Sequence, residues 1–543
     1  MSEALGRVLT YHQQTKHHFH AYARSLGYLD WDTQPDPFRR YQGAPVIELA
    51  QVPPGNAPPY EPAFLVGHVP PAPLDLRGVS QLFFDSLAIS AWKRAGGTFW
   101  ALRVNPSSGN LHPTEGYLVC GPVEGLCDAP MVCHYAPQAH ALERRASFPL
   151  QTWQALTAGL PDDPLLVGLA SIHWREAWKY GERAFRYCQH DVGHAITAIS
   201  IAAAGLGWQA TLLDDVGTAQ LADLLGTSTT RAQGVEAERP DCALAIYPQG
   251  QTCETHALPA DGLAAFSTLA WEGRPNPLSP AHAAWPIIDD VAAATVKPPT
   301  QDVYPPLISP DEPLTLESTP IALRRIIHQR RSARAMDGRS WMPRDVFYKT
   351  LRKTLAGPGQ FPFNALPWRS HIHLALFVHR VRDLEPGLYI LVRDPAQKDA
   401  LQAALRDDLA WVRPAGCPTS LQLYQLSSGD ARALSRQLSC HQEIAADGCF
   451  SLGMIADFEG SLERFGPWFY PRLFWESGMI GQVFYLEAEA AGLGGTGIGC
   501  FFDDPVHQVL GLEGLSYQSL YHFTVGGPVQ DTRLTTLPAY PAD

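Results

Sequence analysis

The chain has 543 residues, more than one hydrophobic core usually serves, so we expect roughly two to four domains. Apolar residues make up 45% of the chain and charged residues 17%, a composition that can bury a large core and excludes wholesale disorder. The net charge of −13, without any long run of lysine or arginine, argues against a nucleic-acid partner.

The first 74 residues predict an arm that is helical at its start and rich in proline from residue 45 to residue 73. The chain turns polar before the apolar core of a signal peptide could form, so we expect a cytoplasmic protein.

Four histidines in this arm suggest a metal site at first sight: His12, His17, His18 and His20. No second ligand cluster with matching spacing accompanies them, so we interpret them as a solvated, partly packed helix face and expect no metal.

Two blocks, residues 75–270 and 321–543, follow this arm, and a proline-rich linker at residues 271–320 separates them. The linker contains eleven of the 47 prolines, which lack the amide donors that helices and sheets need.

The most apolar stretch, residues 195–213, is interrupted by polar residues well short of the ~18 apolar residues of a membrane span, so we expect no membrane partner. The ten cysteines include no C-x-x-C pair and are expected to be buried free thiols.

The two blocks carry the same ordered series of elements, which indicates a duplication. Each has a helix pattern that ends in AAGLG, then an apolar stretch, an acidic pair and a closing strand, at residues 242–248 and 521–528. Further strands are predicted at residues 116–120 and 371–378, and a helix at residues 346–355 between Pro343 and Gly357. The fold class is α+β or mixed α/β. Two copies in one chain can pack as a homodimer does, about an approximate twofold axis.

Two motifs in the first block carry polar groups that could face a ligand. Residues 105–113, NPSSGNLHP, combine short polar side chains with Pro and Gly, which suits a loop that offers hydrogen bonds, although alone the motif predicts only a turn. It lacks the flanking glycines of a serine nucleophile elbow. Lys179 and Tyr180 follow on a helix pattern, where the dipeptide by itself predicts only an exposed lysine and a core tyrosine.

Two motifs in the second block complement them. Residues 328–334, HQRRSAR, place three guanidinium groups and a hydroxyl close together, which suits phosphate oxygens or, alternatively, a solvated basic face. Gly492, Gly494 and Gly497 have the spacing of a dinucleotide fingerprint, but a helix pattern precedes them and a strand pattern follows, the reverse of what that fingerprint requires. We interpret these glycines as the end of a helix that brings backbone amides close to a flat ligand.

Together these motifs resemble the nitroreductase superfamily of FMN-dependent α+β flavoproteins, and within it the SagB-type dehydrogenase branch, which includes azoline oxidases of peptide natural-product pathways. The resemblance implies two tandem nitroreductase-like domains packed as an intrachain pseudo-dimer. It implies that the flavin phosphate is held by the basic motif and by a residue near the carboxyl end: Arg330, Arg331, Ser332, Arg334 and Arg533.

The resemblance also implies contacts to the rest of the flavin. One loop reaches the flavin from the other domain, and we call it the serine loop. It consists of Pro106, Ser107, Ser108, Gly109 and Asn110. Ile498 and Gly499 are the candidates for its N5 edge, and Lys179 and Tyr180 match the catalytic Lys-Tyr pair of the branch.

The blocks differ in what they retain. The first has the serine loop and Lys179-Tyr180 but no counterpart of the basic motif. The second has the basic and glycine-rich motifs but GQFPFNALPW and RFGPWFYPRLFW where the serine loop and the Lys-Tyr pair should be. We therefore predict one FMN per chain, at the interface, and a degenerate opposite site.

Three functions remain open. The first is an FMN-dependent dehydrogenase or oxidase of a small-molecule or peptide-derived substrate, in which Lys179 or Tyr180 removes a proton while hydride moves to flavin N5. The second is an NAD(P)H-dependent reductase of nitroaromatics or quinones. The third is a non-catalytic flavin-binding partner protein. Further oligomerisation is also open.

Overall fold

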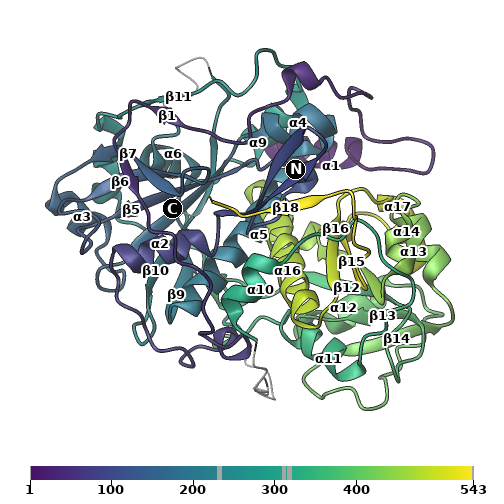
Figure 1. The fold of residues 1–543 in the computed structure, drawn as a ribbon. Coiled ribbons are helices and arrows are strands. Elements are labelled where there is room, and N and C mark those ends of the chain that lie inside the picture. The colour runs from purple at the N-terminus through teal and green to yellow at the C-terminus, as the bar shows by residue number, and fades with distance from the viewer. Residues whose placement is uncertain (1, 229–234, 309–313, 315–320, 541–543) are drawn as a thin grey trace.

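The structure is a computed structural model that describes residues 2–228, 235–308, 314 and 321–540. Each block contains one large antiparallel sheet, and six strands of each sheet share the same order (Figure 1). The first follows β7-β6-β5-β8-β10-β9 and the second β14-β13-β12-β15-β17-β16. The strands of the first sheet are β5 (Thr114–Cys120), β6 (Met131–Ala136), β7 (Ala141–Ser147), β8 (Leu165–Ser171), β9 (Trp208–Leu212) and β10 (Arg239–Pro248). Those of the second are β12 (Ile372–Val378), β13 (Gly387–Leu391), β14 (Leu423–Ser428), β15 (Phe450–Asp457), β16 (Gly494–Ile498) and β17 (Tyr517–Gly526). The shared order confirms the predicted duplication.

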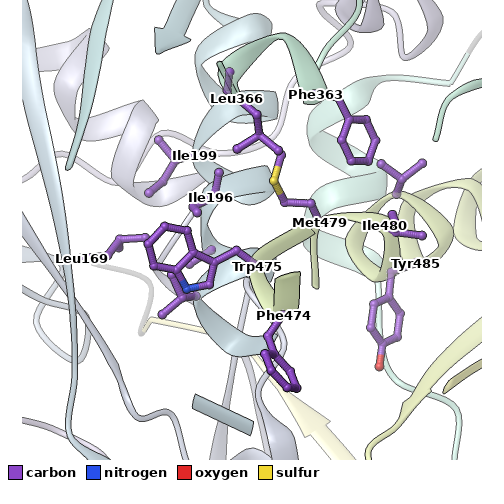
Figure 2. Packing of buried hydrophobic residues seen from close by; sticks show 14 of the residues in the cluster. Leu169, Ile196, Ile199, Phe363, Leu366, Phe474, Trp475, Met479, Ile480 and Tyr485 are labelled. Atoms are coloured by element: carbon purple, nitrogen blue, oxygen red, sulfur yellow. The ribbon is translucent and has the colours of Figure 1, made fainter. Parts of the chain in front are cut away.

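Two long helices, α5 (Ala184–Gly205) and α16 (Tyr470–Ala490), pack against each other at the centre of the molecule (Figure 1). All of α5 and nearly all of α16 are buried, as expected of a helix that is covered on every side. Figure 2 shows Trp475 and Met479 of α16 packed among Ile196 and Ile199 of α5. One apolar cluster runs through both blocks, so the two domains form an intrachain pseudo-dimer with a common core.

The remaining helices cover the sheets or join the blocks. They are α1 (Glu3–Gln14), α2 (Leu76–Phe84), α3 (Leu150–Leu156), α4 (His173–Tyr180), α6 (Thr218–Leu225), α8 (Ala260–Ala264), α9 (Pro286–Ala294), α10 (Leu323–Gln329), α11 (Arg344–Arg352), α12 (Lys398–Ala404), α13 (Arg432–Leu438), α14 (Glu443–Asp447), α15 (Glu459–Phe465) and α17 (Asp503–Leu510). Helix α11 begins after Pro343, as predicted. Among the described residues, no helix is both long and apolar enough to cross a membrane.

The ends of the chain reach across the pseudo-dimer. Strand β18 (Thr535–Leu537) pairs with β3 (Ile89–Ala95) of the first block, which also pairs with β4 (Thr98–Arg103). In Figure 1 this yellow segment crosses from the second block to the first. From the amino-terminal arm, β2 (Val46–Glu48) joins the first sheet, and β1 (Tyr41–Gln42) pairs with β11 (Arg274–Pro275).

The interpretation of the early histidines as a solvated, partly packed helix face holds only in part: His20 is exposed and His18 is half-buried, but His12 and His17 are buried, and only His12 lies on α1. His12 is 1% exposed and lies 3.2 Å from the Tyr470 hydroxyl and 3.1 Å from Gln518 Oε1, and His17 is also buried. Both belong to a segment that the second block covers, because α1 packs in the interface instead of on the surface. The linker also differs from a purely extended arm, since it contains α9; its residues 309–313 and 315–320 lie outside the described part of the chain.

The acidic pairs noted in the sequence connect the blocks symmetrically. Asp214 of the first block pairs with Arg472 at the start of α16, 2.6 Å apart. Asp503 of the second block pairs with Arg186 (2.8 Å) and Arg183 (3.1 Å) near the start of α5. These carboxylates are buried, and each crosses to the other block's long helix. The approximate twofold axis is therefore visible in individual ion pairs.

Candidate functional site

The predicted basic motif leaves α10 and meets the first block inside the molecule. Arg330 is 4% exposed, its Nη2 donates to the Arg103 carbonyl (3.2 Å), and its guanidinium lies over the Tyr485 ring, 4.9 Å from the centroid. Its Nε and Nη1 have no hydrogen-bond partner, and burial lowers the pKa of the group. A buried cation with unpaired donors is costly unless an anion or acceptor meets it.

The residues next to Arg330 are fixed to the glycine-rich strand β16. Ser332 Oγ lies 2.9 Å from the Tyr485 hydroxyl, which accepts a hydrogen bond from the Gly497 amide (3.0 Å). Arg331 donates to the Ser90 carbonyl of the first block (3.3 Å). The glycine-rich segment follows α16 and forms a strand, as predicted. The basic motif and the glycines therefore belong to one site.

Two further arginines that were predicted to contact the phosphate lie elsewhere. Arg334 and Arg533 have side chains 63% and 81% exposed, and both pair with Asp531, at 3.2 and 2.8 Å. The structure places them at the surface, whereas Arg330 is buried.

The serine loop lies against α5 and the Lys-Tyr pair. The Ser108 amide and hydroxyl both donate to Asp191 Oδ1 at 3.0 Å, and Ser107 Oγ accepts from the His112 amide (2.7 Å). Gly109 has φ +60°, and a Cβ there would lie 2.6 Å from the Tyr180 hydroxyl and 3.1 Å from Lys179 Nζ. Only glycine therefore fits, because both the backbone conformation and the space exclude a side chain. The remaining predicted loop residues are Pro106, which is buried, and Asn110, whose Nδ2 donates to the Ala101 carbonyl (2.9 Å).

Burial around the serine loop favours the neutral forms of the acidic side chains there. Burial raises the pKa of Asp191 to about 7, although hydrogen bonds from Ser107 and Ser108 act in the opposite direction. Burial also raises the pKa of Glu176, whose two carboxyl oxygens have no hydrogen-bond partner. The pKa of Tyr180 is raised as well, first by burial and then by Glu176. Tyr180 therefore keeps its proton at neutral pH and can donate a hydrogen bond.

One face of α5 connects the loop to β16. Tyr187 packs edge to face with Tyr180, 4.6 Å between centroids, and on its other side contacts Gly499, where a Cβ would overlap its ring. His190 stacks on Tyr521 at 4.1 Å, and neither of its ring nitrogens has a partner. Ile498, at the end of β16, is buried.

Sequence reasoning missed these α5 residues, together with Tyr485 and Tyr521. The signal was present: Tyr187, His190, Asp191 and His194 recur at the spacing of one helix face within a largely apolar helix. His194 Nε2 lies 3.2 Å from the Tyr521 hydroxyl, which carries the contact into the second block. Within the described ranges, no group of three or more His, Cys, Asp or Glu side chains could hold a metal ion.

The linker packs against the second block beside Asp214, the counterpart of Asp503 in the first block. Tyr304 packs against Trp368 and Phe465, with ring centroids 5.9 and 5.5 Å away, and its hydroxyl donates to Asp214 (2.5 Å). Lys297 lies over the Trp468 ring at 4.5 Å. Trp368 belongs to residues 359–368, which stand where the serine loop would be in the second block. Phe465 and Trp468 belong to residues 464–475, which stand where the Lys-Tyr pair would be.

Comparison with known proteins agrees with this architecture. The family model described as "Nitroreductase family" matches residues 97–242 and 327–527. A curated Methanocaldococcus jannaschii protein named as a nitroreductase is 26% identical over 140 residues; the match covers 25% of this chain and 66%, about two thirds, of that relative. A solved structure from Anabaena variabilis, also described as a nitroreductase, is 22% identical, with a TM-score of 0.69 over 96% of this chain and 99% of that one. The Escherichia coli microcin synthetase McbBCD complex matches 46% of this chain and 94% of its own chain at 18% identity, with a TM-score of 0.28.

Proposed function

Because the chain belongs to the nitroreductase family, we propose that it is an FMN-dependent oxidoreductase with its flavin between the two domains. The observation that carries this proposal is Arg330, a buried guanidinium with two unpaired donors. A phosphate would meet those donors with charge-assisted hydrogen bonds. Ser332 and the Gly497 amide, which share the Tyr485 hydroxyl, lie in the same cluster.

The residues around Arg330 also suit a flat ring. The glycine-rich segment presents backbone instead of side chains at Gly495 and Gly497 of β16 and at Gly499 just after it, and Tyr187 and the serine loop stand opposite across the domain interface. FMN, when bound, supplies an acceptor for hydride at N5 and returns the electrons to a second substrate. The chain's own part is to neutralise the phosphate with Arg330 and to bring backbone near Gly499 against the ring.

We infer one flavin per chain. Tyr304 and the aromatic residues around it pack beside Asp214, the counterpart of Asp503, and Asp214 is already paired with Arg472. Among the described residues, no buried arginine whose donors lack a partner, as those of Arg330 do, lies beside Tyr304.

For the reaction, we favour dehydrogenation of an organic, peptide-derived substrate, as in the SagB-type branch that the motifs resemble. Lys179 and Tyr180 contact the serine loop at Gly109, so both face the interface where the ring would lie. In this arrangement Lys179 removes a proton from the substrate carbon and the protonated Tyr180 donates a hydrogen bond to the substrate. Reduction of the flavin by NAD(P)H is the competing direction.

Flavin binding tests the cofactor assignment. Purified protein reconstituted with FMN should be yellow and hold one FMN per chain. Arg330→Ala should weaken FMN binding about 100-fold, because it removes charge-assisted hydrogen bonds to the phosphate. Arg533→Ala is the matched control, since its exposed guanidinium pairs with Asp531, and should bind FMN as the parent does. Colourless protein, two tightly bound FMN, or normal binding by Arg330→Ala would overturn the assignment.

A second experiment separates chemistry from binding. Lys179→Ala should retain FMN but lose at least about 100-fold in the rate of anaerobic flavin bleaching by an azoline-containing peptide, the usual range for loss of a general base. Lys398→Ala, on the surface helix α12, should bleach normally. Unchanged bleaching in Lys179→Ala would contradict the role of the base. Rapid bleaching by NADPH or NADH alone would show the reductive direction instead.

A further inference from the structure

Two cysteines from separate elements meet beside the candidate site. Cys440 follows α13 and Cys500 follows β16, and their sulfur atoms lie 2.6 Å apart. The backbone holds them together: the Phe502 amide donates to the Leu438 carbonyl (2.8 Å), and Gln442 Nε2 donates to the Cys500 carbonyl (3.0 Å). Both are free thiols and only partly buried, which corrects the expectation that all ten cysteines are buried.

The turn that carries Cys440 has an uncommon conformation. Cys440 and the following His441 have φ of 53° and 57°, in a left-handed region that residues other than glycine rarely adopt. Two consecutive residues of the chain are therefore held in this conformation. Such a backbone persists where its surroundings hold it, and it is frequent at functional sites.

The side chains around the two cysteines stabilise a thiolate at one of them, Cys500. His17 Nδ1 accepts a hydrogen bond from the Ala23 amide (2.9 Å), so the ring proton of the neutral histidine is on Nε2, from which it donates to Cys500. Arg183 lies nearby with an unpaired, buried Nε. The contact with Cys440, followed by the hydrogen bond from His17, lowers the pKa of Cys500 to about 5, while the pKa of Cys440 is raised. Because His17 donates a hydrogen bond to Cys500 and so stabilises its thiolate, Cys500 is the sulfur that attacks.

We propose that Cys440 and Cys500 form a redox-active dithiol site whose substrate is a small-molecule disulfide. The Cys500 thiolate attacks one sulfur of the disulfide, forms a mixed disulfide and releases one thiolate. The Cys440 thiol then gives up its proton and attacks the Cys500 sulfur, which releases the second thiol. The two cysteines are oxidised to an intramolecular disulfide, and the small disulfide is reduced to two thiols, one of which takes the Cys440 proton.

A second thiol pair in the chain serves as an internal reference. Cys120 and Cys127 lie 3.9 Å apart, and Cys127 is also partly exposed, with its pKa lowered to about 7. No histidine or arginine contributes to this shift, which comes mainly from Cys120. Thiol proximity alone would make both pairs react alike, whereas the proposal requires faster reaction at Cys440 and Cys500.

The test uses the reduced full-length chain, with and without FMN, incubated with glutathione disulfide, quenched with acid and analysed by peptide mass mapping. We expect two of the ten thiols to be lost first, as a peptide crosslink between Cys440 and Cys500. Cys440→Ser, which keeps the hydrogen bond from His17 to Cys500, should instead accumulate one glutathionyl group on Cys500, at a rate nearly constant between pH 6 and pH 8. Cys500→Ser should leave Cys440 unmodified over the same time, and Cys253→Ser should behave as the parent.

A chain in which Cys440 and Cys500 stay reduced while Cys127 reacts would overturn the proposal. So would a Cys440→Ser protein whose modification rate rises tenfold for each pH unit, as for an ordinary thiol. Because the reaction needs no flavin, its outcome is independent of the FMN assignment.

Discussion

Asp191 shows how a single residue in this site couples function to stability. Its carboxyl is 1% exposed and accepts hydrogen bonds from the Ser108 amide and hydroxyl, yet burial raises its pKa to about 7. The folded chain thus keeps the proton up to higher pH than the unfolded chain, in which the pKa is near 4. The protonated carboxyl can also donate a hydrogen bond, which the carboxylate cannot.

Asp191→Asn should flatten the pH dependence of stability. Between pH 4 and pH 7 the folded state binds the extra proton, so the stability that this group contributes is fully present below about pH 4 and is lost as the pH rises through 7. The slope is about 1.4 kcal/mol per pH unit. Urea unfolding of the parent and the variant at pH 5 and pH 7 measures it, and the variant should lose less stability across that interval.

Asp241→Asn is the matched control for Asp191→Asn. Asp241 is also a carboxyl whose pKa burial raises to about 7, but it accepts from Ser171 and Gln189, away from the serine loop. Both variants should flatten the stability profile, while only Asp191→Asn should weaken FMN binding. Equal slopes in the parent and Asp191→Asn would contradict the raised pKa.

At the scale of elements, the crossing of α5 and α16 holds the site together. A Cβ on Gly193 would lie 2.8 Å from the Trp475 Cα and closer still to its carbonyl oxygen, and a Cβ on Gly478 would lie 3.0 Å from the Gly193 Cα. The two backbones therefore touch, and neither can yield without moving the helix. This close approach also sets the distance between the α5 face and β16.

Gly193→Ala and Gly478→Ala should each destabilise the protein by about 1–3 kcal/mol or more, because the added methyl group meets backbone instead of a flexible side chain. Gly6→Ala, in α1 with nothing within 4 Å of its Cβ, should be neutral or stabilising by up to about 1 kcal/mol. Denaturant midpoints measure both effects. An unchanged midpoint in Gly193→Ala would show that the helices are not in backbone contact.

The elements themselves were largely predictable. The α11 helix, the strands β5 and β12 and the helix-then-strand order around Gly492 agree with the sequence analysis, because periodicity, proline and glycine act within a few residues. The burial of His12 and His17 was not predicted, because their pattern is that of any polar helix and contact with the second block leaves no signal in the local sequence.

For the whole molecule, the buried ion pairs across the interface make the two domains one unit. Asp503 meets Arg183 and Arg186, and Asp214 meets Arg472, in a core that both blocks share. A domain whose central helix is buried by its neighbour cannot keep its core when the neighbour unfolds. The two domains should therefore unfold together.

Calorimetry should show a single thermal transition, and Asp503→Asn should lower stability by about 3–5 kcal/mol, since it leaves two buried guanidinium groups without a carboxylate. Asp430→Asn, which breaks an exposed pair with Arg432, should cost at most about 1 kcal/mol. Two separate transitions, or equal effects of the two substitutions, would contradict the shared core.

By itself, the sequence determined the duplication, the unequal motifs of the two blocks and the glycine-rich strand after a helix, because these depend on residue order and local geometry. Only the tertiary structure decided that Arg330 is buried with two donors that lack a partner, while Arg334 and Arg533 pair with Asp531 at the surface, and that Tyr304 packs against Trp368. It likewise brought Cys440 to Cys500 and one face of α5 to β16. Such pairings join residues far apart in the chain, and their free energy comes from burial and packing, which no local pattern specifies.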